Sequence, residues 1–119
     1  MNESQKEKPY DLEERTFGFA KRSFSYFKNL SRTPVNIEIS KQGIRSCGSV
    51  GANFIEANEA FSRKDFLMRV KICRKEDKES IYWLRLSEPS NEQEQEKTEL
   101  INEATELMKI FGAIIEKSK

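Results

Sequence analysis

The clearest chemical pattern in this sequence is a set of basic residues between positions 63 and 87. Six of them recur at intervals of seven residues or fall between those positions: Lys64, Lys71, Arg74, Lys75, Lys78 and Arg85. On a helix this spacing forms a ridge about three turns long or more. Such a ridge attracts phosphates through Coulomb interaction and counterion release, without reading a base sequence. The alternative is an ordinary solvated face, balanced by Glu76 and Glu79 or by an acidic neighbouring helix.

Residues suited to catalysis or metal binding are sparse. The chain has no histidine, which removes the commonest general base and the commonest neutral metal ligand. Glu56-x-x-Glu59 and Glu76-x-x-Glu79 have the spacing of carboxylate metal bundles, but they lack the accompanying imidazoles. No Gly-x-Ser-x-Gly elbow or phosphate-binding glycine loop is present. We therefore expect no enzyme activity, no cofactor and no metal; a metal enzyme with carboxylate ligands alone is the alternative hypothesis.

Composition favours one small helical domain. The 119 residues are 36% hydrophobic and 34% charged, which suits amphipathic helices better than a large core. No apolar run is long enough to span a membrane, and the polar start at residues 1–8 is not a signal peptide. Cys47 and Cys73 lack a Cys-x-x-Cys spacing and are interpreted as small buried residues in a reducing cytoplasm. We expect a cytoplasmic protein.

The elements that position the basic residues are four helices. Hydrophobic periodicity and turn signals predict them at about residues 11–31, 34–61, 63–87 and 92–116. They form one bundle over residues 10–117, preceded by a disordered tail at residues 1–9. Thr33 before Pro34 is typical of a helix start, and short connections imply antiparallel neighbours. The net charge of +1 conceals a basic third helix and an acidic fourth.

The first and third helices each have a predicted apolar face. In the first helix the face is Phe17, Ala20, Phe24, Phe27 and Leu30. In the third it is Phe66, Val70, Cys73, Ile81 and Leu84, interrupted by Asp77.

The second helix contains an unusual run of small residues, Cys47, Gly48, Gly51 and Ala52. Each glycine costs a helix interior roughly 1 kcal/mol relative to alanine, so a loop at 47–51 is one interpretation. A continuous helix is favoured because no proline or Asn-Gly pair interrupts the run. Such a helix would keep small residues where another backbone comes close.

A polar row lies along the same helix at intervals of four and three residues. Its members are Gln42, Ser46, Ser49, Asn53 and Glu56. The row could contact a ligand or a lumen. It could instead form a hydrogen-bonded seam within the bundle, with Arg45 or a lysine of the third helix paired to Glu56, and this second interpretation is favoured.

Four ordered motifs resemble a known family. The central motif reads Arg45-Ser46-x-x-Ser49-Val50-Gly51-Ala52-Asn53-Phe54-x-Glu56-Ala57. The others read Asp11-Leu12-Glu13-Glu14-Arg15-Thr16-Phe17, Lys64-Asp65-Phe66, and Lys75-Glu76-x-x-Glu79 followed by Tyr82-Trp83-Leu84. Over about residues 10–86 the chain resembles the proteins encoded in intervening sequences of bacterial 23S rRNA genes. It departs from them at Cys47-Gly48, where Gly-Thr is usual, and at Asp77, where a small apolar residue is usual.

This resemblance implies an all-α, antiparallel up-down four-helix bundle assembled as a homopentameric ring. The accessory variability proteins of diversity-generating retroelements are similar in bundle and ring; they partner a reverse transcriptase and bind nucleic acid through basic surfaces. Two function hypotheses follow. The first is a non-enzymatic homo-oligomer that binds RNA or DNA non-specifically through the basic ridge. The alternative is an accessory subunit of a reverse transcriptase, in which the ridge meets an acidic protein.

Overall fold

The computed structural model describes residues 11–119, which form helices and connections without a β-strand. Four long helices and one short 3-10 helix follow in order: α2 (Leu12–Lys28), α3 (Pro34–Asn58), α4 (Arg63–Leu86), η2 (Asn91–Gln93) and α5 (Glu94–Lys117). The all-α prediction is confirmed for this part of the chain. The tail expected at residues 1–9 lies outside the described residues.

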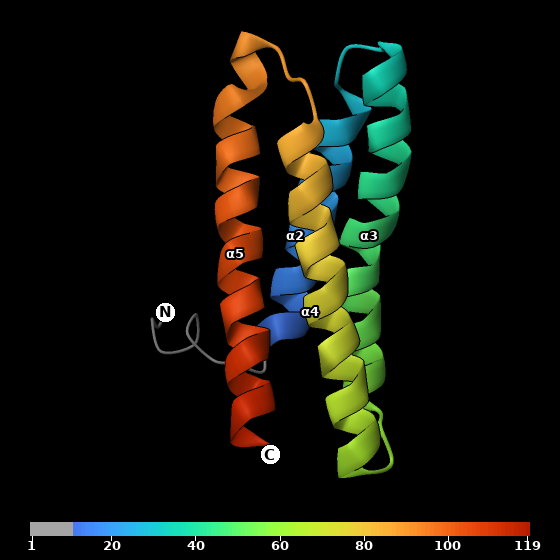
Figure 1. The fold of residues 1–119 in the computed structure, drawn as a ribbon, viewed down its shortest axis with the longest axis vertical. Coiled ribbons are helices and arrows are strands. Elements are labelled where there is room, and N and C mark those ends of the chain that lie inside the picture. The colour runs from blue at the N-terminus through green and yellow to red at the C-terminus, as the bar shows by residue number, and fades with distance from the viewer. Residues whose placement is uncertain (1–10) are drawn as a thin grey trace.

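The four long helices form a bundle in which each runs opposite to the long helix before it (Figure 1). Helix α3 packs between α2 and α4, and α5 packs against α4 and α2, so α2 and α4 lie diagonally across the bundle. None of the helices within 11–119 combines the length and hydropathy that crossing a bilayer requires.

Side chains at the helix starts fix two of the boundaries. The Thr33 hydroxyl accepts a hydrogen bond from the Asn36 backbone amide at 3.1 Å, just before Pro34 begins α3. The Ser62 hydroxyl accepts one from the Asp65 amide at 3.0 Å at the start of α4. Each bond satisfies an amide that has no partner within its own helix, and the predicted starts are confirmed.

Helix α3 passes through its glycines without a break. A Cβ atom placed on Gly51 would lie 2.9 Å from Thr16 Oγ1 and 3.6 Å from the Thr16 carbonyl carbon. A Cβ on Gly43 would overlap the buried ring of Phe27. The continuous helix with a closely approaching neighbour is therefore confirmed, and the loop alternative at 47–51 is wrong.

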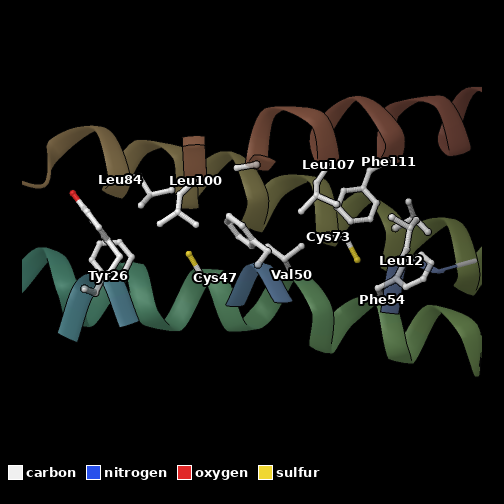
Figure 2. Close-up of a cluster of buried hydrophobic side chains, with 14 of the residues drawn as sticks. Leu12, Tyr26, Cys47, Val50, Phe54, Cys73, Leu84, Leu100, Leu107 and Phe111 are labelled. Atoms are coloured by element: carbon white, nitrogen blue, oxygen red, sulfur yellow. The ribbon is translucent and has the colours of Figure 1, made fainter. Parts of the chain in front are cut away.

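Large apolar side chains fill the centre of the bundle. Figure 2 shows Val50, Phe54, Leu107 and Phe111 converging from α3 and α5. The Phe54 and Phe111 rings have centroids 6.1 Å apart, which joins the two helices across the core. Cys47 and Cys73 are buried and unbonded to each other, at different levels along the bundle.

The predicted apolar face of the first helix is partly wrong. Phe17 is 59% exposed and Phe24 is 39% exposed, whereas Leu12, Phe19 and Tyr26 are buried. Thr16, a small buried residue of α2, lies against Gly51 and lets α2 approach α3 closely. That approach fixes the rotation of α2 and directs Phe17 and Phe24 outward.

A network of polar contacts ties the connections together at one end of the bundle. The buried Asn36 side chain donates to Ser31 O and Glu88 O, both at 3.0 Å, and accepts from the Glu88 amide at 3.0 Å. The Tyr26 hydroxyl lies 2.6 Å from Ser87 Oγ. These bonds hold the α2–α3 connection against the segment after α4.

Candidate nucleic-acid interface

The basic ridge predicted on the third helix lies along α4. Its side chains are exposed at five positions and half-buried at Arg74: the exposed ones are Lys64, Lys71, Lys75, Lys78 and Arg85. The helical rise places about 30 Å between the Lys64 and Arg85 backbones. This length is comparable to one turn of a nucleic-acid duplex, about 34 Å.

Few of the ridge cations are neutralised. Lys75 Nζ lies 3.8 Å from Glu76 Oε2. No ion pair within residues 11–119 is formed by the other five ridge residues, Lys64, Lys71, Arg74, Lys78 and Arg85. Glu76 and Glu79 both extend towards Arg45 of α3. Arg45 Nη1 lies 3.7 Å from Glu76 Oε1, and Arg45 Nη2 lies 3.1 Å from Glu79 Oε1. The expected balance of the ridge by these glutamates is therefore largely absent.

The acidic helix α5 directs several carboxylates to α2 rather than to α4. Arg15 binds Glu103 with two hydrogen bonds of 2.7 and 3.0 Å. Arg22 binds Glu96 at 2.7 Å and Glu99 at 3.0 Å, and its hydrogen bond with Glu96 is the main cause that raises the pKa of the guanidinium. These carboxylates therefore pair with arginines of α2 and do not neutralise the ridge on α4.

The polar row of α3 forms a partial seam with α4. Ser80 Oγ donates to Ser46 Oγ at 3.0 Å, and Arg69 donates to Asn53 Oδ1 at 2.9 Å. Asn53 also donates to the backbone oxygen of Ser49 at 2.9 Å. Glu56 is exposed and forms no ion pair within residues 11–119, so the expected pairing with Arg45 or with a lysine of the third helix is wrong. Arg45 instead reaches Glu76 and Glu79 of α4.

Of the four small residues at the centre of α3, Gly48, Gly51 and Ala52 face α2 and solvent, whereas Cys47 is buried in the core. Gly51 contacts Thr16, while a Cβ on Gly48 would lie 3.3 Å from the Phe24 ring. Ala52 is exposed. The sequence predicted close packing at this run, and the structure assigns that packing to α2.

The structure has an outward apolar face between α2 and α3 that the sequence patterns did not predict. Its exposed large side chains are Phe17, Phe24, Ile44 and Ile55, and the term outer face is used for these four residues. Two hollows of about 590 and 300 Å³ lie along it. A signal was present: Leu12, Phe19 and Tyr26 repeat every seven residues beside the Phe17–Phe24 pair, giving one helix two apolar faces.

The candidate metal carboxylates do not converge. Glu56 and Glu59 are exposed, while Glu76 and Glu79 meet Arg45. Within residues 11–119 no group of three or more histidine, cysteine, aspartate or glutamate side chains could hold a metal ion.

Burial raises the pKa of the Cys47 thiol to about 11 and that of Cys73 to about 12, so both thiols are protonated and poorly nucleophilic at neutral pH.

Comparisons with known proteins agree with the motifs. The model of the 23S rRNA-intervening sequence protein family matches residues 9–113. A crystal structure of a protein of unknown function from the S23 ribosomal protein family of Bacteroides thetaiotaomicron is similar, with a TM-score of 0.75 and 34% sequence identity. The similarity covers 91% of this chain and 97% of that one. No curated protein matches the chain significantly.

Proposed function

The chain belongs to the 23S rRNA-intervening sequence protein family, and from that premise we propose that it is a cytoplasmic, non-enzymatic homo-oligomer that binds RNA or DNA through the basic ridge. The observation that carries the proposal is the exposure of the ridge. Most of its cations lack an ion pair within residues 11–119 and are free to meet phosphates.

Binding through such a ridge needs no particular base sequence. Exposed lysines neutralise phosphates and release condensed counterions, so affinity falls steeply as salt rises. Of the acids beside the ridge, Glu79 lies 3.1 Å from Arg45, and Glu76 lies 3.7 Å from Arg45 and 3.8 Å from Lys75. The expected ligand is therefore a polyanion bound through its backbone.

The outer face supports self-association. Exposed apolar residues that cluster on one side of a small protein mark an interaction surface, and this cluster covers two adjacent helices. We assign its occupant as another copy of this chain, in a ring of five as the family resemblance implies. Symmetry would then repeat the ridge in every copy and extend the positive surface.

Fluorescence anisotropy with labelled RNA at two salt concentrations tests the nucleic-acid part of the proposal. The double variant Lys71→Glu/Lys78→Glu should lose at least about tenfold in affinity, and its salt slope should fall by about 1.4 to 1.8. The matched control is Lys109→Glu/Lys117→Glu, which makes the same charge change on exposed residues of α5. The control should bind more tightly than the ridge variant.

Two outcomes would count against the proposal. Absence of wild-type binding at low salt would remove nucleic acid as the ligand. Equal affinity of the ridge variant and the wild type would remove the ridge as its site, and would favour the alternative in which the ridge meets an acidic protein such as a reverse transcriptase.

A further inference from the structure

An exposed aromatic ring interrupts the basic ridge near the end of α4. Tyr82 is 55% exposed and follows Lys78 by four residues, while Arg85 follows Tyr82 by three. Side chains four and three residues apart lie next to one another on a helix. Tyr82 therefore lies on the ridge itself, with a cation one turn away on each side.

The Tyr82 ring is held in place by its neighbour. Its centroid lies 4.9 Å from that of Trp83, with the two ring planes at 73°. Trp83 is partly buried against the core and its indole Nε1 is buried, so it provides a firm support. An edge-to-face contact of this kind leaves one ring oriented and still exposed to solvent.

We propose that Tyr82 is a stacking platform for an unpaired base, and that the nucleic acid held by the ridge is single-stranded where it crosses this end of α4. The inference rests on the proposed function and narrows its ligand. In single-strand recognition, basic side chains follow the phosphates and an aromatic ring accepts a base on its face. A duplex keeps its bases stacked on each other and offers Tyr82 no such face.

The ridge contains an internal control for this inference. Met68 follows Lys64 by four residues and precedes Lys71 by three, so its position repeats that of Tyr82. It is exposed to a similar extent, 51%, but has no aromatic face. Comparing the two residues separates stacking from general apolar contact.

The experiment measures affinity for three probes: an oligo-U RNA and an oligo-dT DNA, each of about 20 nucleotides, and an RNA duplex of about 20 base pairs. Tyr82→Ala should weaken single-strand binding about fivefold to hundredfold, with less than about a twofold change for the duplex. Tyr82→Phe should retain single-strand affinity, and Met68→Ala should resemble the wild type on all probes. Unequal losses on the two single strands would identify RNA or DNA as the preferred source of the base.

Trp83, the only tryptophan in the chain, supplies a second readout. A base stacked on Tyr82 lies close to the indole, so single strands should change Trp83 emission in the wild type and much less in Tyr82→Leu. The leucine variant keeps apolar packing on Trp83 and serves if the alanine variant unfolds.

The outcomes separate this inference from the proposed function. If Lys71→Glu/Lys78→Glu weakens binding while Tyr82→Ala does not, or Tyr82→Ala weakens single strand and duplex equally, the stacking role is wrong and the ridge stands. If the wild type binds none of the probes at low salt, both are wrong. If Tyr82→Ala changes only the oligomer mass, Tyr82 belongs to a protein contact and the stacking role is again wrong.

Discussion

Asp77 lies on the side of α4 that faces the centre of the bundle. Its side chain is fully buried, and neither carboxyl oxygen forms a hydrogen bond within residues 11–119. Burial, followed by the charge of Glu103, raises the pKa of this carboxyl to about 8. A buried carboxylate without partners is costly, so at neutral pH the group is mainly protonated.

The raised pKa makes stability depend on pH. The ordinary pKa is 3.8, so well below pH 4 Asp77 is protonated in both the folded and the unfolded chain and makes no pH-dependent contribution to stability. Between about pH 4 and pH 8 the unfolded chain ionises while the folded chain does not. The contribution of Asp77 to stability is thus present in acid and is lost as pH rises towards about 8, by up to roughly 5 kcal/mol.

Asp77→Asn should remove this dependence. Urea unfolding midpoints of the wild type and the variant should diverge steadily from pH 4 to pH 8, with the variant more stable at the alkaline end. Glu106→Gln, which changes an exposed acid of α5, should follow the wild type. Parallel curves for Asp77→Asn and the wild type would show that the carboxyl ionises with an ordinary pKa.

At the scale of the elements, the effect of a helix glycine on stability depends on which atoms lie against it. Gly43 and Gly112 both occupy helix interiors, where alanine is the better helix former by about 1 kcal/mol. A Cβ on Gly43 overlaps the Phe27 ring, which is 2% exposed and cannot move aside freely. A Cβ on Gly112 meets nothing within 4 Å.

The two substitutions should therefore have opposite signs. Gly43→Ala should lower the free energy of unfolding by about 1 to 3 kcal/mol, because overpacking exceeds the gain in helix propensity. Gly112→Ala should raise it by up to about 1 kcal/mol. Thermal and urea unfolding measure both; stabilisation by Gly43→Ala would mean that α2 and α3 can separate at little cost.

Asn36 joins elements that are distant in sequence. Replacing it with alanine leaves the Glu88 amide and two carbonyl oxygens without these partners, so Asn36→Ala should cost about 2 to 4 kcal/mol. Asn102→Ala, on the exposed side of α5, should cost less than about 0.5 kcal/mol. A loss of similar size in both variants, measured by urea unfolding, would contradict the assignment of Asn36 as a tie between connections.

The helices were predictable because their signals are local. Thr33 and Ser62 cap helices within three residues of themselves, and the ridge spacing on α4 lies within one helix. The rotation of α2 was not predictable from one helix, because its two apolar series compete and Thr16 decides between them through Gly51. Likewise, the preference of Arg45 for Glu79 depends on how α3 and α4 are aligned.

At the scale of the whole molecule, the ridge and the outer face occupy different sides of the bundle. The outer face lies on α2 and α3, whereas the ridge lies on α4, diagonally across from α2. Copies that associate through the outer face therefore leave the ridge accessible. Assembly and nucleic-acid binding can then be separated by mutation.

Phe17→Lys/Phe24→Lys should disrupt the assembly without unfolding the bundle, because neither ring belongs to the core cluster. Light scattering should give a multiple of 13.9 kDa for the wild type and 13.9 kDa for the variant. Met68→Lys, an exposed apolar residue of α4 placed away from the outer face, should keep the wild-type mass. A monomeric wild type, or a variant of unchanged mass, would remove the outer face as the contact between copies.

The same monomeric variant should still bind short single-stranded RNA through its one ridge. It should lose affinity mainly for long RNA, because linked ridges bind a long strand with a high effective concentration and a single ridge does not. Anisotropy with an RNA of about 20 nucleotides and one several times longer measures this difference. An equal loss on both lengths would mean that the ridge needs a neighbouring copy to complete its site, since avidity acts only where one strand can span two ridges.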